Sequence, residues 1–187
     1  MNENITNLFS DNIVIPSIKD ANGLEKALRT EHKVVFVLYG DLLNIGEIIK
    51  KLKDKGKIVF VNLDLLVGFS SKEIIIPYLK KYTELDGILS SKASLVKESK
   101  KHGLISIHRF FLIDSFSYQN MYKQLKISKP DILEILPGWD KVVSWTKKKV
   151  DIPIISGGLV CKDDMVRQSI KAGAVAVSTT NIKLWNL

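Results

Sequence analysis

Short apolar runs alternate with longer amphipathic stretches along almost the whole chain. Eight of these runs are too apolar to be half-exposed strands, and each is followed by a stretch with the apolar spacing of a helix. Strands that are buried on both faces belong to parallel sheets covered by helices. Eight strand–helix units predict a compact, closed (β/α)8 barrel of the TIM type rather than an open doubly wound sheet.

The positions of the elements follow from the same pattern. The predicted strands are 13–16, 34–39, 58–63, 87–89, 104–111, 131–136, 152–155 and 174–177. The predicted helices are 20–29, 41–53, 72–82, 93–101, 117–125, 141–149 and 163–172. Residues 1–12 are expected to be a polar lead-in, and residues 13–187 a single barrel domain. The chain has 187 residues, fewer than the roughly 200 or more usual for this fold, so one helix is expected to be vestigial.

Small and hydroxylated residues follow the last two predicted strands. Glycine lets backbone N–H groups approach an anion closely, because it has no Cβ. A short helix capped by Thr180 or Asn181 would also direct its N-terminal N–H groups at a phosphate, and these two loops commonly hold phosphate in (β/α)8 barrels. Two tight turns without a ligand are the alternative. The predicted phosphate-binding residues are Gly157, Gly158, Ser178, Thr179, Thr180 and Asn181.

Polar residues at the other strand ends should face the same mouth of the barrel. Arg109 lies inside an otherwise apolar run, and a buried charge without a partner is very costly, so we expect it to pair with Glu134 or Asp64. The pair either closes the mouth structurally or forms a polar pocket for the hydroxylated end of a phosphate ester, to which Lys92 would add positive charge. The predicted polar contacts of the ligand are Asp64, Lys92, Arg109, Glu134 and Ser156.

The residues give little indication of catalysis or of a cofactor. No nucleophile, base and orienting group can be assembled into a set. Asp64 and Glu134, on separate strands, are weak evidence for a metal site, and none is expected. The single cysteine, Cys161, excludes an internal disulfide framework and a multi-cysteine metal site. His32 and His102 lie on or beside predicted helices and are expected to be solvated.

The charge balance favours an anionic partner. The net charge is +8 and the pI is near 9.4, which is typical of proteins that meet nucleic acid. However, 25 of the 28 basic residues are lysines, and arginine is the better residue for bidentate contacts. The lysine groups are therefore either a basic surface or merely solvated. They are Lys50-Lys51-Lys53, Lys80-Lys81, Lys100-Lys101 and Lys147-Lys148-Lys149.

Nothing in the chain predicts export or membrane insertion. No apolar run approaches the roughly 18 residues that a membrane span requires. The first residues lack a basic region followed by an apolar one, which a signal peptide would have. A cytoplasmic protein is expected.

Several segments are together characteristic of one family. The more specific ones are Arg-Phe-Phe-x-x-Asp-Ser at 109–115 and Glu-x-Leu-Pro-Gly at 134–138. The others are Asn-Leu-Asp-Leu-Leu-Val-Gly at 62–68, Asp-Gly-Ile-Leu-Ser-Ser at 86–91, Ile-Pro-Ile-Ile-Ser-Gly-Gly-Leu at 152–159 and Gly-Ala-Val-Ala-Val-Ser-Thr-Thr-Asn at 173–181. In this order they resemble the glycerol uptake operon antiterminator regulatory protein family over nearly the whole chain from Ile13.

The resemblance implies a barrel that senses a ligand and does not turn it over. Such proteins look like sensors of glycerol 3-phosphate that bind the leader mRNA of a glycerol-metabolism operon and prevent a terminator hairpin. A homodimer that places two basic faces side by side would help such binding. The alternative is a small phosphate-binding barrel enzyme, such as an isomerase, aldolase or synthase of phosphorylated sugars. A sensor that acts through a protein partner is a third hypothesis.

Individual positions agree with the family to different degrees. Asp64 and Asp114 match, as do Arg109, Glu134 and the two glycine- or hydroxyl-rich turns. Asn62 stands where histidine is expected, Ser91-Lys92 where Thr-Arg is usual, and His108 where glutamine is usual. Because these departures are expected to line the mouth, they bear on the identity of the ligand more than on the fold.

Overall fold

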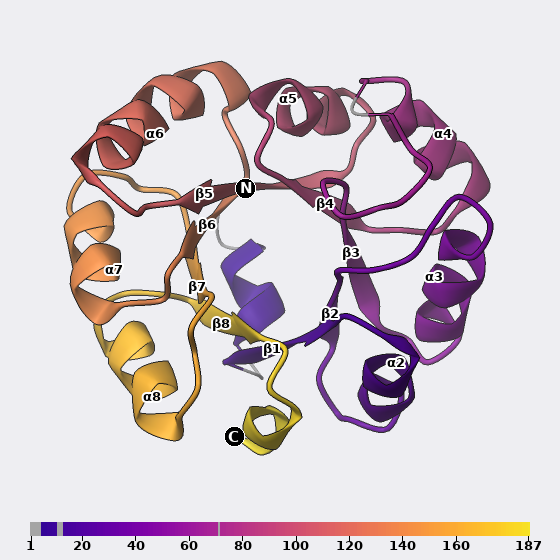
Figure 1. Cartoon of the computed structure of the whole chain (residues 1–187), viewed down its shortest axis with the longest axis horizontal. Coiled ribbons are helices and arrows are strands. Elements are labelled where there is room, and N and C mark those ends of the chain that lie inside the picture. The colour runs from indigo at the N-terminus through magenta and orange to yellow at the C-terminus, as the bar shows by residue number, and fades with distance from the viewer. Residues whose placement is uncertain (1–4, 11–12, 71) are drawn as a thin grey trace.

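The computed structural model describes residues 5–10, 13–70 and 72–187, and these form a closed barrel of eight parallel strands ringed by helices (Figure 1). The strands follow one another around the barrel in chain order, and β8 pairs in parallel with β1 to close it. This confirms the predicted (β/α)8 fold.

Most element boundaries lie within two or three residues of the predicted ones. The strands are β1 (Val14–Ile18), β2 (Val34–Val37), β3 (Ile58–Asn62), β4 (Gly87–Ser90), β5 (Ile105–Phe111), β6 (Ile132–Leu136), β7 (Ile154–Gly157) and β8 (Ala176–Thr179). The α-helices are α2 (Ala21–Ala27), α3 (Ile45–Lys53), α4 (Ile75–Tyr82), α5 (Ala93–Lys101), α6 (Ser115–Ser128), α7 (Asp140–Lys147) and α8 (Asp163–Lys171).

The last unit has the vestigial helix. After β8 the chain forms only a 3-10 helix, η2 (Ile182–Asn186). The side chain of Asn181 caps it by accepting a hydrogen bond from the N–H of Lys183, so of the two predicted caps Asn181 is the one used.

β7 and β8 end later than the sequence predicts. Gly157 and Ser178, expected in turns, are neighbours in the β7–β8 ladder, and Pro16 of β1 pairs with Thr179. The ladder is made by backbone groups and continues past the point where the side chains stop being apolar. Apolar character therefore marked only the first part of each strand.

The inside of the barrel is apolar toward the amino ends of its strands. Ile15, Phe36, Phe60 and Ile107 are buried there, and Phe9, in the 3-10 helix η1 (Asn7–Phe9), packs in the same cluster. Within the expected lead-in, residues 1–4 and 11–12 lie outside the described residues. Phe9 therefore contributes to the core from a segment that reads as polar.

The outer face of the strands packs against the helices. Outward-facing residues of β2 and β3, such as Val35 and Val61, form one cluster with the apolar faces of the neighbouring helices. No helix in the described part of the chain has the length and apolar character needed to cross a bilayer.

One sequence prediction about histidine is wrong. His32 is buried, and its Nε2 lies 2.5 Å from the main-chain oxygen of Trp185. The contact joins residues 153 positions apart in the chain, so the local sequence around His32 gives no indication of it.

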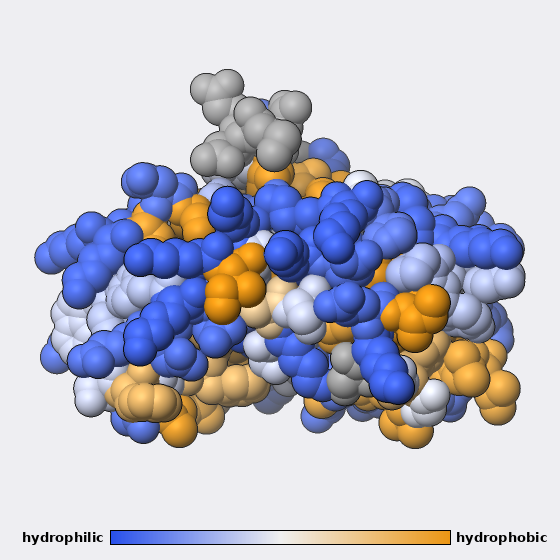
Figure 2. Space-filling view, turned by 90° about the horizontal axis from the view of Figure 1, so that it is seen from above, coloured by the Kyte–Doolittle hydropathy of each residue, from blue (hydrophilic) through white to orange (hydrophobic). Residues whose placement is uncertain are grey.

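Hydrophobic side chains are exposed just after the carboxyl ends of the strands. Leu43, Ile113 and Leu159 lie in loops and Phe116 in the first turn of α6, and all four are well exposed. In Figure 2, hydrophobic surface gathers mainly along the lower edge, whereas the rest of this face is largely hydrophilic.

Candidate functional site

A layer of polar side chains lies above the apolar interior, at the carboxyl ends of the strands. Each of these residues is two positions after an inward-facing apolar residue, and alternate residues of a strand face the same side. Thus Arg109 follows Ile107, Glu134 follows Ile132 and Ser178 follows Ala176. The strand period therefore positions the site, because the last inward-facing residues of the strands converge at the mouth.

Glu134 is the centre of this layer. Nε of Arg109 donates to its Oε2 at 2.5 Å, and Oγ of Ser178 donates to its Oε1 at 2.7 Å. The Glu134 side chain is completely buried and that of Arg109 is 10% exposed. Of the two partners predicted for Arg109, the structure selects Glu134. Both carboxylate oxygens are satisfied, as burial of a charge requires.

A cavity of about 410 Å³ opens over this ion pair. Of the predicted site residues, it is lined by Arg109, Glu134, Gly158, Ser178, Thr179, Thr180 and Asn181. It is also lined by residues outside the prediction, namely Ser17, Leu38, Leu136, Leu159, Val160 and Cys161. The polar groups thus lie at the floor, on β1 and in the turn after β8, and aliphatic side chains from the ends of β2 and β6 and from the loop after β7 complete the wall.

Two glycines shape the β7 side of the cavity. A Cβ on Gly157 would overlap Oγ of Ser178 and approach Oε1 of Glu134 to 3.1 Å, so the Glu134–Ser178 contact needs a glycine there. Gly158 has a φ of 68° and the following Leu159 has a φ of 53°. A left-handed conformation is strained for leucine, and such strain clusters at ligand-binding sites.

The turn after β8 is ordered by its own side chains. Oγ1 of Thr179 accepts a hydrogen bond from the N–H of Asn181 at 3.1 Å and donates to the main-chain oxygen of Val160. The Asn181 amide donates to the main-chain oxygen of Cys161 at 3.4 Å. The β7 and β8 loops are therefore linked, and both face the cavity with small residues.

The structure places three predicted contacts away from the cavity. Ser156 has the opposite strand phase, and its Oγ donates to Oγ of Ser169 on α8. Asp64 accepts hydrogen bonds from Oγ of Ser90 and the N–H of Ser91, across the β3–β4 loops. Lys92 is the exposed residue that precedes α5. None of the three lines the cavity described above.

Of the positions where the chain departs from the resemblance, His108 also faces away from the mouth. It is buried between β5 and α6, with Nδ1 2.8 Å from Oγ of Ser128 and Nε2 3.2 Å from the main-chain oxygen of Ser91. Burial lowers the pKa of His108 to about 4, and the Ser91 carbonyl and Asp64 only partly oppose this. His108 is neutral at pH 7 and packs as a structural residue.

The cavity combines one buried ion pair with hydroxyl and amide groups. Its one carboxylate and its one guanidinium are paired with each other, and no lysine or histidine is among the described residues that line it. Within the described residues, no group of three or more histidine, cysteine or acidic side chains is arranged to hold a metal ion. The polar side chains that line it are those of Ser17, Arg109, Glu134, Ser178, Thr179, Thr180 and Asn181.

Three relatives resemble this chain over almost its full length. The uncharacterized protein YgcP of Escherichia coli (strain K12) is 45% identical over 184 residues, which are 98% of this chain and 96% of the relative. The crystal structure of a glycerol uptake operon antiterminator regulatory protein from Listeria monocytogenes str. 4b F2365 is 31% identical, with a TM-score of 0.92, and covers 95% of this chain and 97% of its own. A glycerol uptake operon antiterminator-related protein from Thermotoga maritima MSB8 is 32% identical, with a TM-score of 0.82, covering 93% of this chain and 98% of its own.

The family model described as the glycerol-3-phosphate responsive antiterminator matches residues 14–185, from the first strand to the last 3-10 helix. This match confirms the resemblance drawn from the segments around Arg109, Glu134 and the two turns. The chain belongs to the glycerol-3-phosphate responsive antiterminator family.

Proposed function

We propose that this protein binds glycerol 3-phosphate in the mouth cavity and, in response, binds the leader mRNA of a glycerol-metabolism operon to prevent transcription termination. The proposal combines the family of the chain with the chemistry of the cavity. No cofactor is required for this activity. It would take place in the cytoplasm, where transcripts are elongated.

The arrangement of Arg109, Glu134 and Ser178 beneath the β7 and β8 loops carries the proposal. A phosphate monoester would meet the small residues Gly158, Thr180 and Asn181, where backbone N–H groups can approach an anion. The Arg109 guanidinium lies at the floor and adds positive charge. The hydroxyl groups of glycerol are of the kind that a carboxylate and a serine hydroxyl bind well. In this proposal, the phosphate and the two hydroxyl groups of glycerol 3-phosphate each have polar partners on the cavity wall.

The same geometry gives little support to the enzyme alternative. Glu134, the one carboxylate among the described residues that line the cavity, is held by Arg109 and Ser178. No histidine or lysine of that lining stands beside it to share in proton transfer. A Schiff-base aldolase needs a lysine, and none is among the described residues lining the cavity. We therefore propose binding without turnover.

Calorimetry tests the ligand. Glycerol 3-phosphate is expected to bind far more tightly than glycerol, because the phosphate carries the charge that the loops and Arg109 recognise. Inorganic phosphate added as a competitor should weaken the binding. Equal affinities for glycerol and glycerol 3-phosphate would contradict a phosphate site.

Filter binding tests the RNA. The probe is the in vitro transcribed leader of the glycerol-metabolism operon from the same genome, with a scrambled RNA of equal length as control. Glycerol 3-phosphate should strengthen binding of the leader, and binding should weaken with rising salt. Absence of a ligand effect at every salt concentration would refute the proposed function. Turnover of a phosphorylated sugar that Glu134→Gln abolishes would favour the enzyme.

A further inference from the structure

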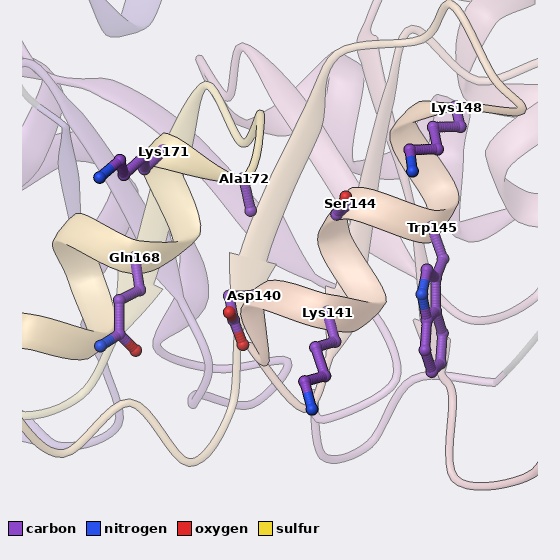
Figure 3. Close-up of a pocket in the computed structure, with 8 residues that line it drawn as sticks. All are labelled: Asp140, Lys141, Ser144, Trp145, Lys148, Gln168, Lys171 and Ala172. Atoms are coloured by element: carbon purple, nitrogen blue, oxygen red, sulfur yellow. The ribbon is translucent and has the colours of Figure 1, made fainter.

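A groove of about 360 Å³ lies on the outer wall of the barrel between α7 and α8, away from the mouth cavity (Figure 3). Its lining is polar and basic. α7 and the residue after it contribute Asp140, Lys141, Ser144, Trp145 and Lys148, and α8 and its end contribute Gln168, Lys171 and Ala172. The one carboxylate, Asp140, lies in the first turn of α7, where a negative charge is stabilised by the helix dipole.

The lysines of this groove differ from most of those on α3 and α5. On these two helices, the basic side chains other than Lys97 form ion pairs with carboxylates. These ion pairs are Lys50–Asp54, Lys51–Glu47, Lys53–Asp86, Lys100–Asp131 and Lys101–Glu98. In contrast, Lys141, Lys148 and Lys171 form no ion pair with any carboxylate of residues 5–10, 13–70 and 72–187. The groove therefore gathers three lysines on one surface whose charge no carboxylate of the described residues neutralises.

Trp145 adds an aromatic surface to the same groove. Its side chain is 55% exposed, which is unusual for a tryptophan. Lys141 precedes it by four residues and Lys148 follows it by three, so the helix period brings both lysines beside the indole. Figure 3 shows Lys141 and Trp145 projecting in the same direction from α7. An exposed indole between two cations is a combination that binds nucleobases and phosphates together.

A rival surface on α4 lacks this combination. Tyr82 is exposed there, but Nζ of Lys81 lies 5.2 Å from the centre of its ring and covers one face. Lys149, next to the groove, is similarly placed over the rings of Tyr118 and Tyr122. These lysines and rings are occupied with each other, whereas the indole of Trp145 has no such partner among the described residues.

The groove is connected to the mouth cavity by a short chain of contacts. Oγ of Ser156 on β7 donates to Oγ of Ser169 on α8, which donates to the main-chain oxygen of Gly138 just before α7, both at 3.1 Å. The N–H of Gly138 in turn donates to the main-chain oxygen of Gly158 at 3.0 Å. Gly158 lines the cavity. A ligand that shifts Gly158 would therefore also shift Gly138, which precedes α7, and through it Ser169 on α8.

We propose that the groove between α7 and α8 is the RNA-binding surface, where a base of a single-stranded leader segment stacks on Trp145 and phosphates contact Lys141, Lys148 and Lys171. This inference rests on the proposed antiterminator function. Single-stranded RNA fits better than a duplex, because only unpaired bases expose a face to an aromatic side chain. The serine and glutamine of the groove supply neutral hydrogen-bonding groups beside the cations.

Two triple variants with equal net charge test the surface. The groove variant carries Lys141→Gln, Lys148→Gln and Lys171→Gln, and the control variant carries Lys50→Gln, Lys51→Gln and Lys101→Gln, three lysines that are paired with carboxylates. Binding of fluorescein-labelled leader RNA is followed by fluorescence anisotropy with saturating glycerol 3-phosphate. The groove variant should bind at least tenfold more weakly, and its log–log salt slope should be shallower by about 2. The control variant should bind within about twofold of wild type.

Substitution of Trp145 separates stacking from charge. Trp145→Leu should weaken RNA binding by about 5- to 150-fold without changing the salt slope, because stacking releases no counterions. Trp145→Phe should retain most of the affinity, since it retains an aromatic face. Calorimetry with glycerol 3-phosphate provides the check that each variant is folded and has an intact mouth cavity.

The outcomes test the assignment of the groove as the RNA-binding surface separately from the proposed antiterminator function. Equal losses in the two triple variants would show a diffuse charge effect and overturn the assignment of the groove. Full RNA affinity in the groove variant and in Trp145→Leu would overturn it as well, while leaving the proposed function intact. Failure of the wild-type protein to bind leader RNA with glycerol 3-phosphate present would overturn the proposed function, and the groove assignment with it.

Discussion

Arg109 and Glu134 are direct neighbours in the β5–β6 ladder, and their side chains form a hydrogen-bonded ion pair at 2.5 Å. Both lie at the floor of the mouth cavity and are almost completely buried. The pair has two consequences. It fixes the position of a guanidinium and a carboxylate at the floor of the cavity, and it leaves either buried charge without a partner when the other is removed.

Removal of one member of this pair should be more harmful than removal of both. Arg109→Leu leaves the buried Glu134 carboxylate without its cation, which is expected to lower the free energy of unfolding by about 3–5 kcal/mol. The double variant Arg109→Leu/Glu134→Leu should recover most of this loss, because no buried charge remains. Urea unfolding measures both. A single variant as stable as wild type would contradict the dependence, and neither variant should bind glycerol 3-phosphate.

Gly157 should tolerate no side chain. A methyl group there would overlap Oγ of Ser178 and press on Glu134, so Gly157→Ala is expected to cost about 1–3 kcal/mol of stability and to weaken glycerol 3-phosphate binding more than tenfold. Gly46→Ala is the matched control. Gly46 lies on α3 with nothing within 4 Å of an added Cβ, so alanine should stabilise the protein by about 0.5–1 kcal/mol. Urea unfolding and calorimetry compare the two, and equal effects would contradict the role of Gly157.

Ser169 should transmit the effect of ligand binding in the mouth cavity to the groove, without itself contacting the ligand or the RNA. Ser169→Ala removes the hydrogen bonds that Oγ makes with Ser156 and with Gly138. We expect the affinity for glycerol 3-phosphate to remain near that of wild type. In wild type the ligand should strengthen RNA binding by about 5- to 150-fold, the range typical of such coupling, and this enhancement should be smaller in the variant. Anisotropy titrations with and without ligand measure the enhancement. An unchanged enhancement would show that the signal takes another route.

His108 should make the fold sensitive to mild acid. Its pKa in the folded protein is about 4, below the value of about 6.5 in an unfolded chain. Between these pH values the unfolded chain binds a proton and the folded protein does not. The free energy of unfolding therefore falls as the pH falls through this window, by about 1.4 kcal/mol per pH unit.

His108→Gln tests this prediction. The variant removes the titrating group, and the amide of glutamine retains the capacity to donate and accept hydrogen bonds. Between pH 7 and pH 5, wild type should lose about 2 kcal/mol more stability than the variant. Urea unfolding at a series of pH values measures the difference. Identical pH profiles would show that His108 is protonated without cost in the folded protein.

The sequence by itself determined the fold. Continuous apolar runs and their alternation with helices specify a parallel barrel, because strands covered on both faces must be apolar. An arginine embedded in an apolar run had to be buried with a carboxylate partner, since an isolated buried charge is too costly, and the sequence narrowed that partner to Glu134 or Asp64. These requirements act locally or between neighbouring strands, so they can be read along the chain.

Only the tertiary structure decided which polar residues share the cavity. Ser156 and Gly157 are adjacent in sequence, yet the strand phase directs one toward α8 and the other toward Ser178. The strand is buried on both faces and its end carries small and polar residues, so the sequence gives no alternation from which to tell the two faces apart there. Likewise the lysine groups look alike in sequence. Carboxylates distant in the chain, such as Asp86 and Asp131, neutralise some of them, whereas the packing of α7 on α8 brings three others into one groove beside Trp145.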